Sequence, residues 1–412
     1  MLRRASAGVR RLVRDLLPEP IRRTYHRYAL LRDFGIEAGT GRRRVSRLDA
    51  TLPRGINVVG WFDSPSGIGQ SARSLVRAAE SAGIPVAKID VSTLDSGRRP
   101  AAPYASNLFH VNADGAASIV ELCGPAVHRG RANVGYWYWE TEELPAGWRD
   151  RFSYFDEIWV ASGFCRAAIA KQSEIPVVVV APPVIMESSR PPAPGSQLRE
   201  PGHFRFLTIS DAESVPERKN PLGAVRAFAR SFPADRSVSL TVKIGNADKA
   251  PGLVRTLESA AAGARVEIDT SPLGRDEIER LLAGCDAYVS LHRAEGFGLP
   301  IAEAMALGKS VVATDYSGPR DFLDETTGYP VRWRPAVLDS ALGPYPAGSR
   351  WAEPDEEHAA QMLSRVVADR GEAAKRAEAG RRRIQSEYGV KTGGHRVAER
   401  LDRLLARLAA RP

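Results

Sequence analysis

Residues 294–314 read AEGFGLPIAEAMALGKSVVAT and contain two glutamates, Glu295 and Glu303, with seven residues between them. The preceding run 286–290, DAYVS, has the composition of a short buried strand, and Pro300 is well placed as the first residue of a helix. The order is therefore strand, glycine-containing loop, helix and a further strand. In a parallel sheet such loops lie beyond the carboxyl ends of the strands, where ligands bind, and the free N–H groups at a helix start favour an anion. The stretch predicts a phosphate site in an α/β fold.

The loop between this strand and helix suits close contact with a ligand. Glycine lets the backbone approach a bound group, so the loop amides can donate hydrogen bonds to phosphate or sugar oxygens. Glu295 is placed to face a reacting sugar, and Glu303, one turn into the helix, to accept two hydrogen bonds from a ribose diol. An isolated glutamate is usually a solvated surface residue, so the prediction depends on the whole segment. The amides expected to bind belong to Gly296, Phe297, Gly298 and Leu299.

The stretch EGFGLPIAEAMALGKSVVAT closely resembles the E(x7)E signature of retaining glycosyltransferases of family 4, which have the GT-B fold. The segments SLHRAEGFG, 290–298, and TDYSGPRDF, 314–322, resemble a bacterial subgroup that acts in polysaccharide biosynthesis. The resemblance implies an α/β protein of two doubly wound, Rossmann-like domains facing a cleft. It also implies transfer of a sugar from a nucleotide donor with retained anomeric configuration.

Length and composition agree with a folded protein of this size. The 412 residues leave room for about two or three domains, and 43% hydrophobic with 26% charged residues is ordinary for a globular chain. Cys123, Cys165 and Cys285 are an odd number without metal-ligand spacing, which predicts reduced, mostly buried thiols. No apolar run approaches the roughly 20 residues of a membrane-spanning helix. These features predict a cytoplasmic chain.

The positive charge is concentrated at the N-terminus. Residues 1–47 hold 13 arginines, no lysine and four acidic residues, so their net charge of +9 equals that of the whole chain. Apolar residues alternate with the first arginines in the pattern of a basic amphipathic helix. Such a helix either binds the anionic inner face of the cell membrane or packs on the enzyme. Both alternatives are open, whereas nucleic acid is disfavoured because no recognised motif accompanies the charge. The apolar residues are Leu2, Val9, Leu12, Val13, Leu16 and Leu17.

Two alternations of strand and helix follow this tail of residues 1–50. Residues 51–190 are predicted to form an N-terminal Rossmann-like acceptor domain, and residues 203–390 a C-terminal nucleotide-sugar domain. The segment Ser188–Gly202, rich in Pro, Ser and Gly, is the predicted linker. In GT-B enzymes the last helix usually returns to the first domain, and 391–412 is expected to do so. Strands are predicted at 55–62, 85–89, 107–111, 133–138, 157–160, 177–180, 204–209, 238–244, 265–268, 286–290 and 310–313.

A positive pair is expected beside the glycine loop. Arg218 and Lys219 follow the first strand of the second domain, and both can form charge-assisted hydrogen bonds to a departing diphosphate. RKNP matches the family element that grips the diphosphate, which implies this role for both residues. Upstream, SDAESVPE departs from the aromatic-Asp pattern of the family, so the conformation of this loop is open.

The first domain offers weaker signals. Gly67 and Gly69 follow a strand and precede a helix, where bare backbone can approach the donor phosphate or the acceptor, and their segment resembles the first glycine loop of the family. Both are assigned to donor binding. A family histidine near this point contacts the donor sugar, and the resemblance carries that role to His110; an equally good alternative is a structural histidine. An aromatic group can offer ring faces to an acceptor, although such clusters more often form core or interface. It comprises Tyr136, Trp137, Tyr138, Trp139 and Trp148, near Glu140, Glu142 and Glu143.

The mechanism implied needs no enzymic nucleophile. The acceptor hydroxyl attacks the face from which the diphosphate departs, and a phosphate oxygen of the leaving group serves as base. No Asp-x-Asp occurs in the chain, which predicts a metal-independent reaction whose only cofactor-like partner is the nucleotide sugar. A membrane-facing tail favours a lipid-linked glycan or a growing polysaccharide as acceptor. Two rivals are a glycoside hydrolase with two catalytic glutamates and a catalytically silent nucleotide-sugar-binding scaffold at the membrane.

Overall fold

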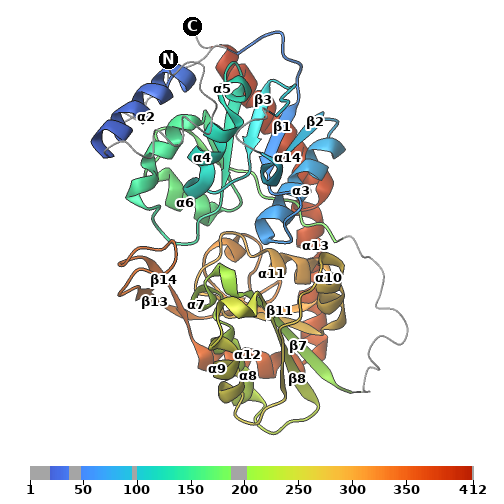
Figure 1. Ribbon diagram of the computed structural model, residues 1–412. Helices are drawn as coiled ribbons and strands as arrows, with labels where there is room; N and C mark the ends of the chain where they lie inside the picture. Colours follow the sequence, from blue (N-terminus) through green and yellow to red (C-terminus); the bar gives the residue numbers. More distant parts are fainter. Residues whose placement is uncertain (1–18, 37–47, 95–99, 187–201, 411–412) are drawn as a thin grey trace.

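The computed structural model describes residues 19–36, 48–94, 100–186 and 202–410. Figure 1 shows two lobes, one above the other, each built on one sheet with helices on its faces. Both sheets have six strands, and all pairings within them are parallel. The predicted class, two doubly wound Rossmann-like domains, is confirmed.

The first lobe contains six short strands, and each predicted strand is found with its ends shifted by at most two residues. The sheet order is 2-1-3-4-5-6, and its central strands are buried along their whole length, as expected when helices cover both faces of a parallel sheet. The elements are β1 (Ile56–Gly60), α3 (Gly67–Ser81), β2 (Val86–Asp90), β3 (Ser106–Phe109), α4 (Ala113–Cys123), α5 (Pro125–His128), β4 (Ala132–Trp137), β5 (Glu157–Val160), α6 (Gly163–Ala170) and β6 (Val177–Val179).

A row of buried asparagines aligns three of these strands. Asn57, Asn107 and Asn133 lie side by side on β1, β3 and β4. Asn57 Nδ2 donates to Asn107 Oδ1 at 2.9 Å, and Asn107 Nδ2 donates to Asn133 Oδ1 at 2.8 Å. A shift of register would leave buried amides without partners, so the row fixes the alignment of the strands.

The second lobe repeats the pattern and again contains all the strands predicted for it. Its sheet order is 12-11-10-7-8-9, so the strand order reverses between the seventh and tenth strands of the chain. The elements are β7 (Phe204–Asp211), α7 (Pro216–Lys219), α8 (Pro221–Ser231), β8 (Val238–Gly245), α9 (Leu253–Ala260), β9 (Val266–Asp269), α10 (Arg275–Gly284), β10 (Ala287–Ser290), α11 (Leu299–Ala306), β11 (Ser310–Thr314), β12 (Tyr329–Val331), α12 (Glu356–Ala368) and α13 (Arg370–Glu387).

The last helix, α14 (Val390–Ala409), packs against α3 and β4 of the first lobe. A Cβ at Gly394 would lie 2.4 Å from the carbonyl oxygen of Ala78, so glycine permits the close crossing. The fully buried Glu157 of β5 is paired with Arg400 and, at 3.2 Å, with Arg407 of α14. Helix α14 is therefore part of the first lobe.

A hairpin in the second lobe was not predicted. Strands β13 (Trp333–Val337) and β14 (Arg350–Pro354) are antiparallel and lie beside the junction of the lobes (Figure 1). β13 is only partly buried and contains Pro335, which removes a donor from the ladder, so its sequence lacks the pattern of a sheet strand.

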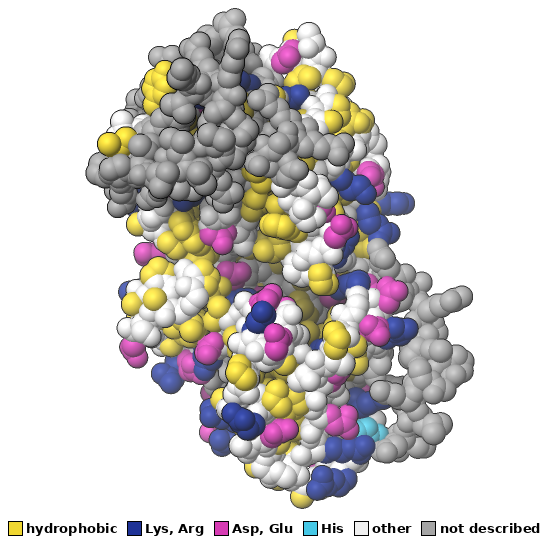
Figure 2. All heavy atoms as spheres, viewed as in Figure 1, with side chains coloured by type: hydrophobic (Ala, Val, Ile, Leu, Met, Phe, Trp, Pro, Cys, Tyr) yellow, Lys and Arg dark blue, Asp and Glu magenta, His cyan; other side chains and the backbone are white. Residues whose placement is uncertain are grey.

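The N-terminal region is described only in part. Helix α2 (Glu19–Phe34) packs on the first lobe, where the ring of Phe34 lies 5.4 Å from that of His128. Residues 1–18 and 37–47, and all of the predicted linker except Gly202, lie outside the described residues. On the described part of the second lobe, basic and acidic side chains are interspersed (Figure 2), in keeping with the charge concentrated in residues 1–47.

Two general expectations can be compared with the structure. Cys123, Cys165 and Cys285 are buried free thiols. Within the described residues, no helix combines the length and the apolar character that crossing a membrane requires.

Candidate active site

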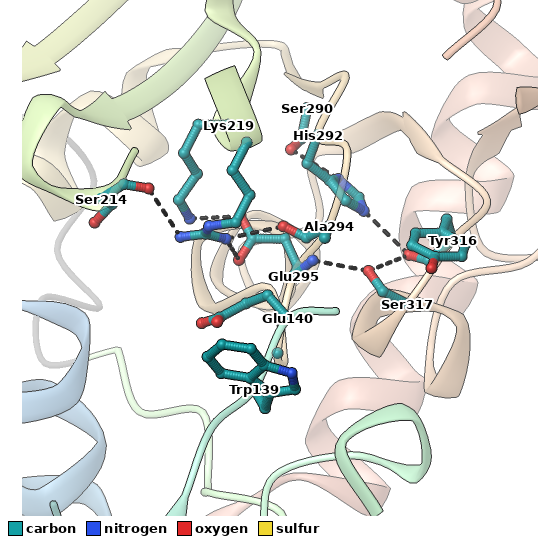
Figure 3. Close-up of polar contacts among 12 residues, drawn as sticks. Trp139, Glu140, Ser214, Lys219, Ser290, His292, Ala294, Glu295, Tyr316 and Ser317 are labelled. Atoms are coloured by element: carbon teal, nitrogen blue, oxygen red, sulfur yellow. Dashed lines mark hydrogen bonds and ion pairs between the residues drawn. The ribbon is translucent and has the colours of Figure 1, made fainter. Parts of the chain in front are cut away.

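Three charged side chains meet where the strand order of the second sheet reverses. Arg218 and Lys219 lie in α7, after β7, and Glu295 lies in the loop after the adjacent strand β10. Arg218 Nη1 is 3.2 Å from Glu295 Oε2, and Lys219 Nζ is 2.5 Å from Glu295 Oε1 (Figure 3). Ligands of open α/β sheets bind at this carboxyl edge, at the point of reversal. The structure thus brings together three predicted site residues from distant parts of the chain.

This cluster is largely withdrawn from solvent and carries a formal charge of +1. The side chains of Arg218, Lys219 and Glu295 are 7%, 17% and 9% exposed. Burial opposes ionisation of Glu295, but Lys219 and then Arg218 outweigh it and hold the pKa of Glu295 at about 2. Burial also disfavours the charged form of Arg218, yet Glu295 raises its pKa above the ordinary value. An anionic ligand is the natural complement of two cations that share one carboxylate.

Backbone groups hold the Arg218 guanidinium in place. It donates to the carbonyl oxygens of Ala294, at 2.8 Å, and Ser214, at 3.3 Å (Figure 3). Val215, immediately before α7, has φ 58°, a conformation rare for a β-branched residue. Such backbone strain costs about 1–3 kcal/mol and is concentrated at functional sites. The loop that departs from the family pattern is therefore a strained turn.

Asn220 connects this turn to the loop that carries Glu295. Its own φ is 52°, and its side-chain oxygen accepts from Gly223 N at 3.0 Å, which caps α8. Its amide nitrogen donates to the carbonyl oxygen of Leu291 at 2.9 Å. Asn220 is 3% exposed, so both contacts are buried. The asparagine of RKNP therefore shapes the site without facing a ligand.

A second loop supports Glu295 from behind. Glu295 N donates to Ser317 Oγ at 2.8 Å, Ser317 Oγ donates to Tyr316 O at 2.7 Å, and Gly318 N donates to Glu295 O at 2.9 Å. His292 Nε2 lies 3.1 Å from Tyr316 O, as Figure 3 shows. Ser317 has φ 62°, a backbone conformation that is rare for a non-glycine residue and is concentrated at functional sites. These residues belong to the two segments whose resemblance to a family subgroup was noted.

The predicted amide-lined loop divides into two parts. Gly298 has φ 89° and stands at the N-terminal cap of α11, followed by Leu299 as its first residue. A Cβ at Gly296 would lie 3.1 Å from Tyr138 of the first lobe, so glycine permits this approach. Phe297 is 3% exposed and packs in an aromatic core, which makes its side chain structural. The backbone of the loop, and not the ring, is what a ligand can meet.

Glu303 is engaged by a partner that sequence analysis did not identify. It is 2% exposed, and its Oε1 lies 2.6 Å from Arg275 Nη2 of α10. Arg275 is also paired with the fully buried Glu279, at 2.9 Å. Burial raises the pKa of Glu303 despite the opposing effect of Arg275. A ribose diol would therefore have to share Glu303 with Arg275.

His110 lies beneath the surface of the first lobe. Its ring is fully buried, stacks on Tyr136 with centroids 4.6 Å apart, and has Nε2 3.0 Å from Ser71 Oγ. Tyr138 OH donates to the same Ser71 oxygen at 2.5 Å. Burial lowers the pKa of His110 to about 4, which keeps the imidazole neutral near pH 7. In this conformation the His110 ring is covered, and the Ser71 hydroxyl lies between His110 and Tyr138.

The predicted glycines of the first lobe differ from each other. A Cβ at Gly69 would lie 2.4 Å from the carbonyl oxygen of Ser64, so Gly69 is needed for packing. A Cβ at Gly67 would meet no atom within 4 Å. Gly67, at the start of α3, therefore has open space beside it.

The hairpin bridges the two lobes next to the charged cluster. Tyr345, between β13 and β14, donates to Glu140 Oε2 at 2.9 Å and lies 5.3 Å from the ring of Trp139. Tyr316 makes a similar bridge at 3.3 Å to Glu142. Of the aromatic group proposed to hold an acceptor, Tyr136, Trp137 and Trp139 are buried, so the core-and-interface alternative describes these three. Tyr345 had no signal in the sequence, because its role depends on a hairpin with an irregular pattern.

A search of the described residues for three or more His, Cys, Asp or Glu side chains that could hold a metal ion found no such group.

Comparison with solved structures defines the class of protein. HepE of Anabaena, solved with UDP and glucose, is 14% identical, with 85% of this chain and 99% of that chain covered and a TM-score of 0.62. Sucrose-phosphate synthase of Thermosynechococcus elongatus is 15% identical, with coverages of 86% and 100% and a TM-score of 0.63. A glycosyltransferase of Rickettsia africae gives 15%, coverages of 86% and 99%, and a TM-score of 0.60. The fold is that of the GT-B glycosyltransferases.

The family follows from the sequence itself. The family model described as "Family 4 Glycosyltransferase in conflict systems" matches residues 162–394, more than half of the chain. The chain belongs to this family, which confirms the expected likeness to family 4. A comparison with curated proteins found no match.

Proposed function

We propose that this glycosyltransferase moves a hexose from a nucleotide-diphosphate sugar to a glycan or lipid-linked acceptor, with retained anomeric configuration, in cell-surface polysaccharide biosynthesis. The observation that carries the proposal is the cluster of Arg218, Lys219 and Glu295 at the reversal point of the second sheet, beside the start of α11. Residues 203–390 form the donor domain in this proposal, and residues 51–190 the acceptor domain. HepE, which shares the fold, has been solved with UDP-glucose.

Donor binding rearranges the charged cluster. The diphosphate carries about two negative charges, and it competes with Glu295 for Lys219 and Arg218. Release of the Glu295 carboxylate, which lies 2.5 Å from Lys219 Nζ, frees it to accept hydrogen bonds from the hexose hydroxyls. The backbone bonds of Arg218 to Ala294 and Ser214 keep the guanidinium in position throughout. Electrostatic stabilisation that is already in place before reaction is the most effective kind.

When the diphosphate departs, it leaves space on one face of an oxocarbenium-like sugar. The acceptor hydroxyl attacks from this face and transfers its proton to the leaving phosphate oxygen. Positive charge from Arg218 and Lys219 stabilises the phosphate as the glycosidic bond breaks. No covalent enzyme intermediate is part of this scheme. His110, in this proposal, positions Tyr138 through the Ser71 hydroxyl.

A hydrolase mechanism fits the geometry less well. It needs one carboxylic acid that is protonated near pH 7 and a second carboxylate across the bond. Glu295 has its pKa held at about 2, so it cannot be the acid. Glu303 has a raised pKa but is 2% exposed and paired with Arg275. These two glutamates therefore do not form a hydrolytic pair.

The donor is tested by thermal shift with UDP, GDP, ADP and their common sugar conjugates, since a ligand that binds only the folded state raises its apparent stability. We expect one base to stabilise the wild type and Arg226→Ala, whose exposed side chain lies on α8, but not Arg218→Ala. No stabilisation by any of these nucleotides would contradict the proposed donor site.

Glu295→Gln separates an enzyme from a silent scaffold. The variant keeps the size of the side chain but removes the charge, so we expect it to bind donor and to transfer sugar far more slowly. If the protein is a scaffold, the wild type also transfers no sugar, whichever acceptor preparation is supplied. We also propose that transfer is metal-independent; activity abolished by EDTA and restored by magnesium would contradict this.

Membrane attachment through residues 1–47 is the final part of the proposal. Its basis is the net charge of +9 in this segment. Because α2 packs on the first lobe, deletion of residues 1–18 alone is the cleaner test. In liposome flotation, we expect anionic vesicles to bind the full chain and to bind much less of the truncated protein. Equal binding of the two proteins would contradict membrane attachment.

A further inference from the structure

One large apolar side chain is exposed at the edge of the first sheet. Trp61, directly after β1, is 40% exposed. The other large hydrophobic side chains with comparable exposure in the described residues lie elsewhere, on α2, β6 and β13. Tryptophan is costly to leave in water and is enriched at binding surfaces. A solvent-facing tryptophan at a strand end offers a flat apolar ring face to a ligand.

The loop that presents Trp61 is firmly held, although the ring is not covered. Arg73 donates to the carbonyl oxygens of Phe62, at 2.6 Å, and Ser64, at 2.8 Å. The amide of Phe62 donates to Asp90 Oδ2 at 2.9 Å. On the opposite side, a Cβ at position 69 would lie 2.7 Å from the carbonyl oxygen of Trp61. The backbone is thus preorganised while the indole stays accessible, which reduces the entropic cost of binding.

Trp61 lies on the edge of the first sheet that faces the second lobe. All strands of this sheet are parallel, so their carboxyl ends lie along one edge. At that edge, Ser162 Oγ donates to Gly296 O at 2.6 Å, and Gly163 N donates to Asp321 Oδ2 at 2.8 Å. The open space beside Gly67 lies on the same loop as Trp61. Trp61 therefore lies at the edge of the first sheet that contacts the second lobe, and the second lobe carries the charged cluster.

We propose that the indole of Trp61 is a stacking platform for a pyranose ring of the acceptor. One face of a pyranose presents mainly C–H groups, which pack on an aromatic ring, while the hydroxyls stay hydrated or meet polar groups of the loop, such as Asp63 and Ser66. The inference rests on the proposed function, because it takes the acceptor to be a glycan. It assigns Trp61 to acceptor affinity and not to donor binding or bond breaking.

The test is a glycan array probed with the full-length wild type, Trp61→Ala, Trp61→Phe and Tyr28→Ala. Tyr28, on α2, is 61% exposed and serves as the matched exposed aromatic outside this edge. We expect Trp61→Ala to lose about fivefold or more of the signal on the glycans that the wild type binds. Trp61→Phe should retain most of the signal, and Tyr28→Ala all of it.

Two outcomes would overturn the inference: equal binding by Trp61→Ala and wild type, or no glycan bound by the wild type. A parallel thermal shift with UDP separates this inference from the donor proposal. An unchanged UDP shift in every variant shows that the folds and donor sites are intact. If UDP stabilises none of the proteins but the array contrast holds, UDP is not the donor nucleotide and the role of Trp61 stands.

Discussion

The two sides of the junction between the lobes are built from different chemistry. On the second lobe, Arg218, Lys219 and Glu295 form a charged cluster held by backbone bonds and by a strained turn. On the first lobe, the exposed Trp61 follows β1, and the buried, neutral His110 follows β3 and is linked to Tyr138 through Ser71. Charge stabilises a leaving phosphate, whereas rings and hydroxyls recognise sugars. In our proposal the second lobe determines whether the sugar is transferred, and the first lobe determines which acceptor receives it.

The largest effect is expected from removing charge on the second lobe. Arg218→Ala should lower the transfer rate by about 10³-fold, because a preorganised donor to the developing phosphate charge is lost. The rate is measured as kcat/KM for the donor, and Arg226→Ala, whose side chain is 55% exposed, is the control. A rate within a few-fold of the wild type would mean that the charged cluster is structural. The proposed difference in function between the two sides of the junction would then be wrong.

The neutral side is tested by acid. The pKa of His110 falls from 6.5 to about 4 on burial, so between these values the unfolded chain binds more protons than the folded one. The wild type should therefore lose stability as the pH falls from 6.5 to 4, by on the order of 3 kcal/mol from this residue. His110→Gln should lose less over the same range, as followed by urea unfolding. Parallel pH profiles for the two proteins would show that His110 is not buried in its neutral form.

A smaller effect is expected from the support behind Glu295. Ser317→Ala removes the acceptor for the Glu295 amide, 2.8 Å away, and should lower kcat about tenfold while nucleotide affinity stays unchanged. Ser231→Ala is matched, because Ser231 also contacts backbone carbonyls but lies on α8, away from the site. If both variants lose only stability, Ser317 does not position Glu295.

The smallest effect concerns the bridge between the sides. Tyr345→Phe removes the hydrogen bond to Glu140 but keeps the ring on Trp139, so local opening of residues 338–349 should increase about fivefold. Hydrogen exchange measures this opening, and Tyr28→Phe is the exposed control. Unchanged exchange in 338–349 would mean that the hydroxyl contributes nothing to the bridge.

Strands β1 to β11 could be predicted because strands of a covered parallel sheet are short apolar runs separated by Gly and Pro, whereas the three-residue strand β12 was not predicted. The same rules located Glu295 and the start of α11. The hairpin escaped because β13 contains Pro335 and is partly exposed, and its position depends on contacts distant in sequence. Arg293 pairs with Glu353 at 2.7 Å, and Ala352 N donates to Arg293 O.

Sequence patterns also could not predict the partners of the site residues. His110 was placed correctly at a strand end, but only packing decides that Ser71 and Tyr138 cover it. Arg275 pairs with Glu303 from a different helix, and no local sequence motif predicts this ion pair. Periodicity assigns a residue to an element and an edge, whereas burial and pairing depend on the assembled lobes.

The return of α14 to the first lobe has a consequence for synthesis. Glu157 is fully buried, and apart from the Trp159 indole its described partners are arginines of α14, more than 240 residues further along the chain. A buried carboxylate without its counter-charge is strongly destabilising. During translation the first sheet therefore cannot reach its final stability when its own strands leave the ribosome. It must wait until the second lobe and α14 have been made, so the first lobe is completed only after the second lobe has been synthesised.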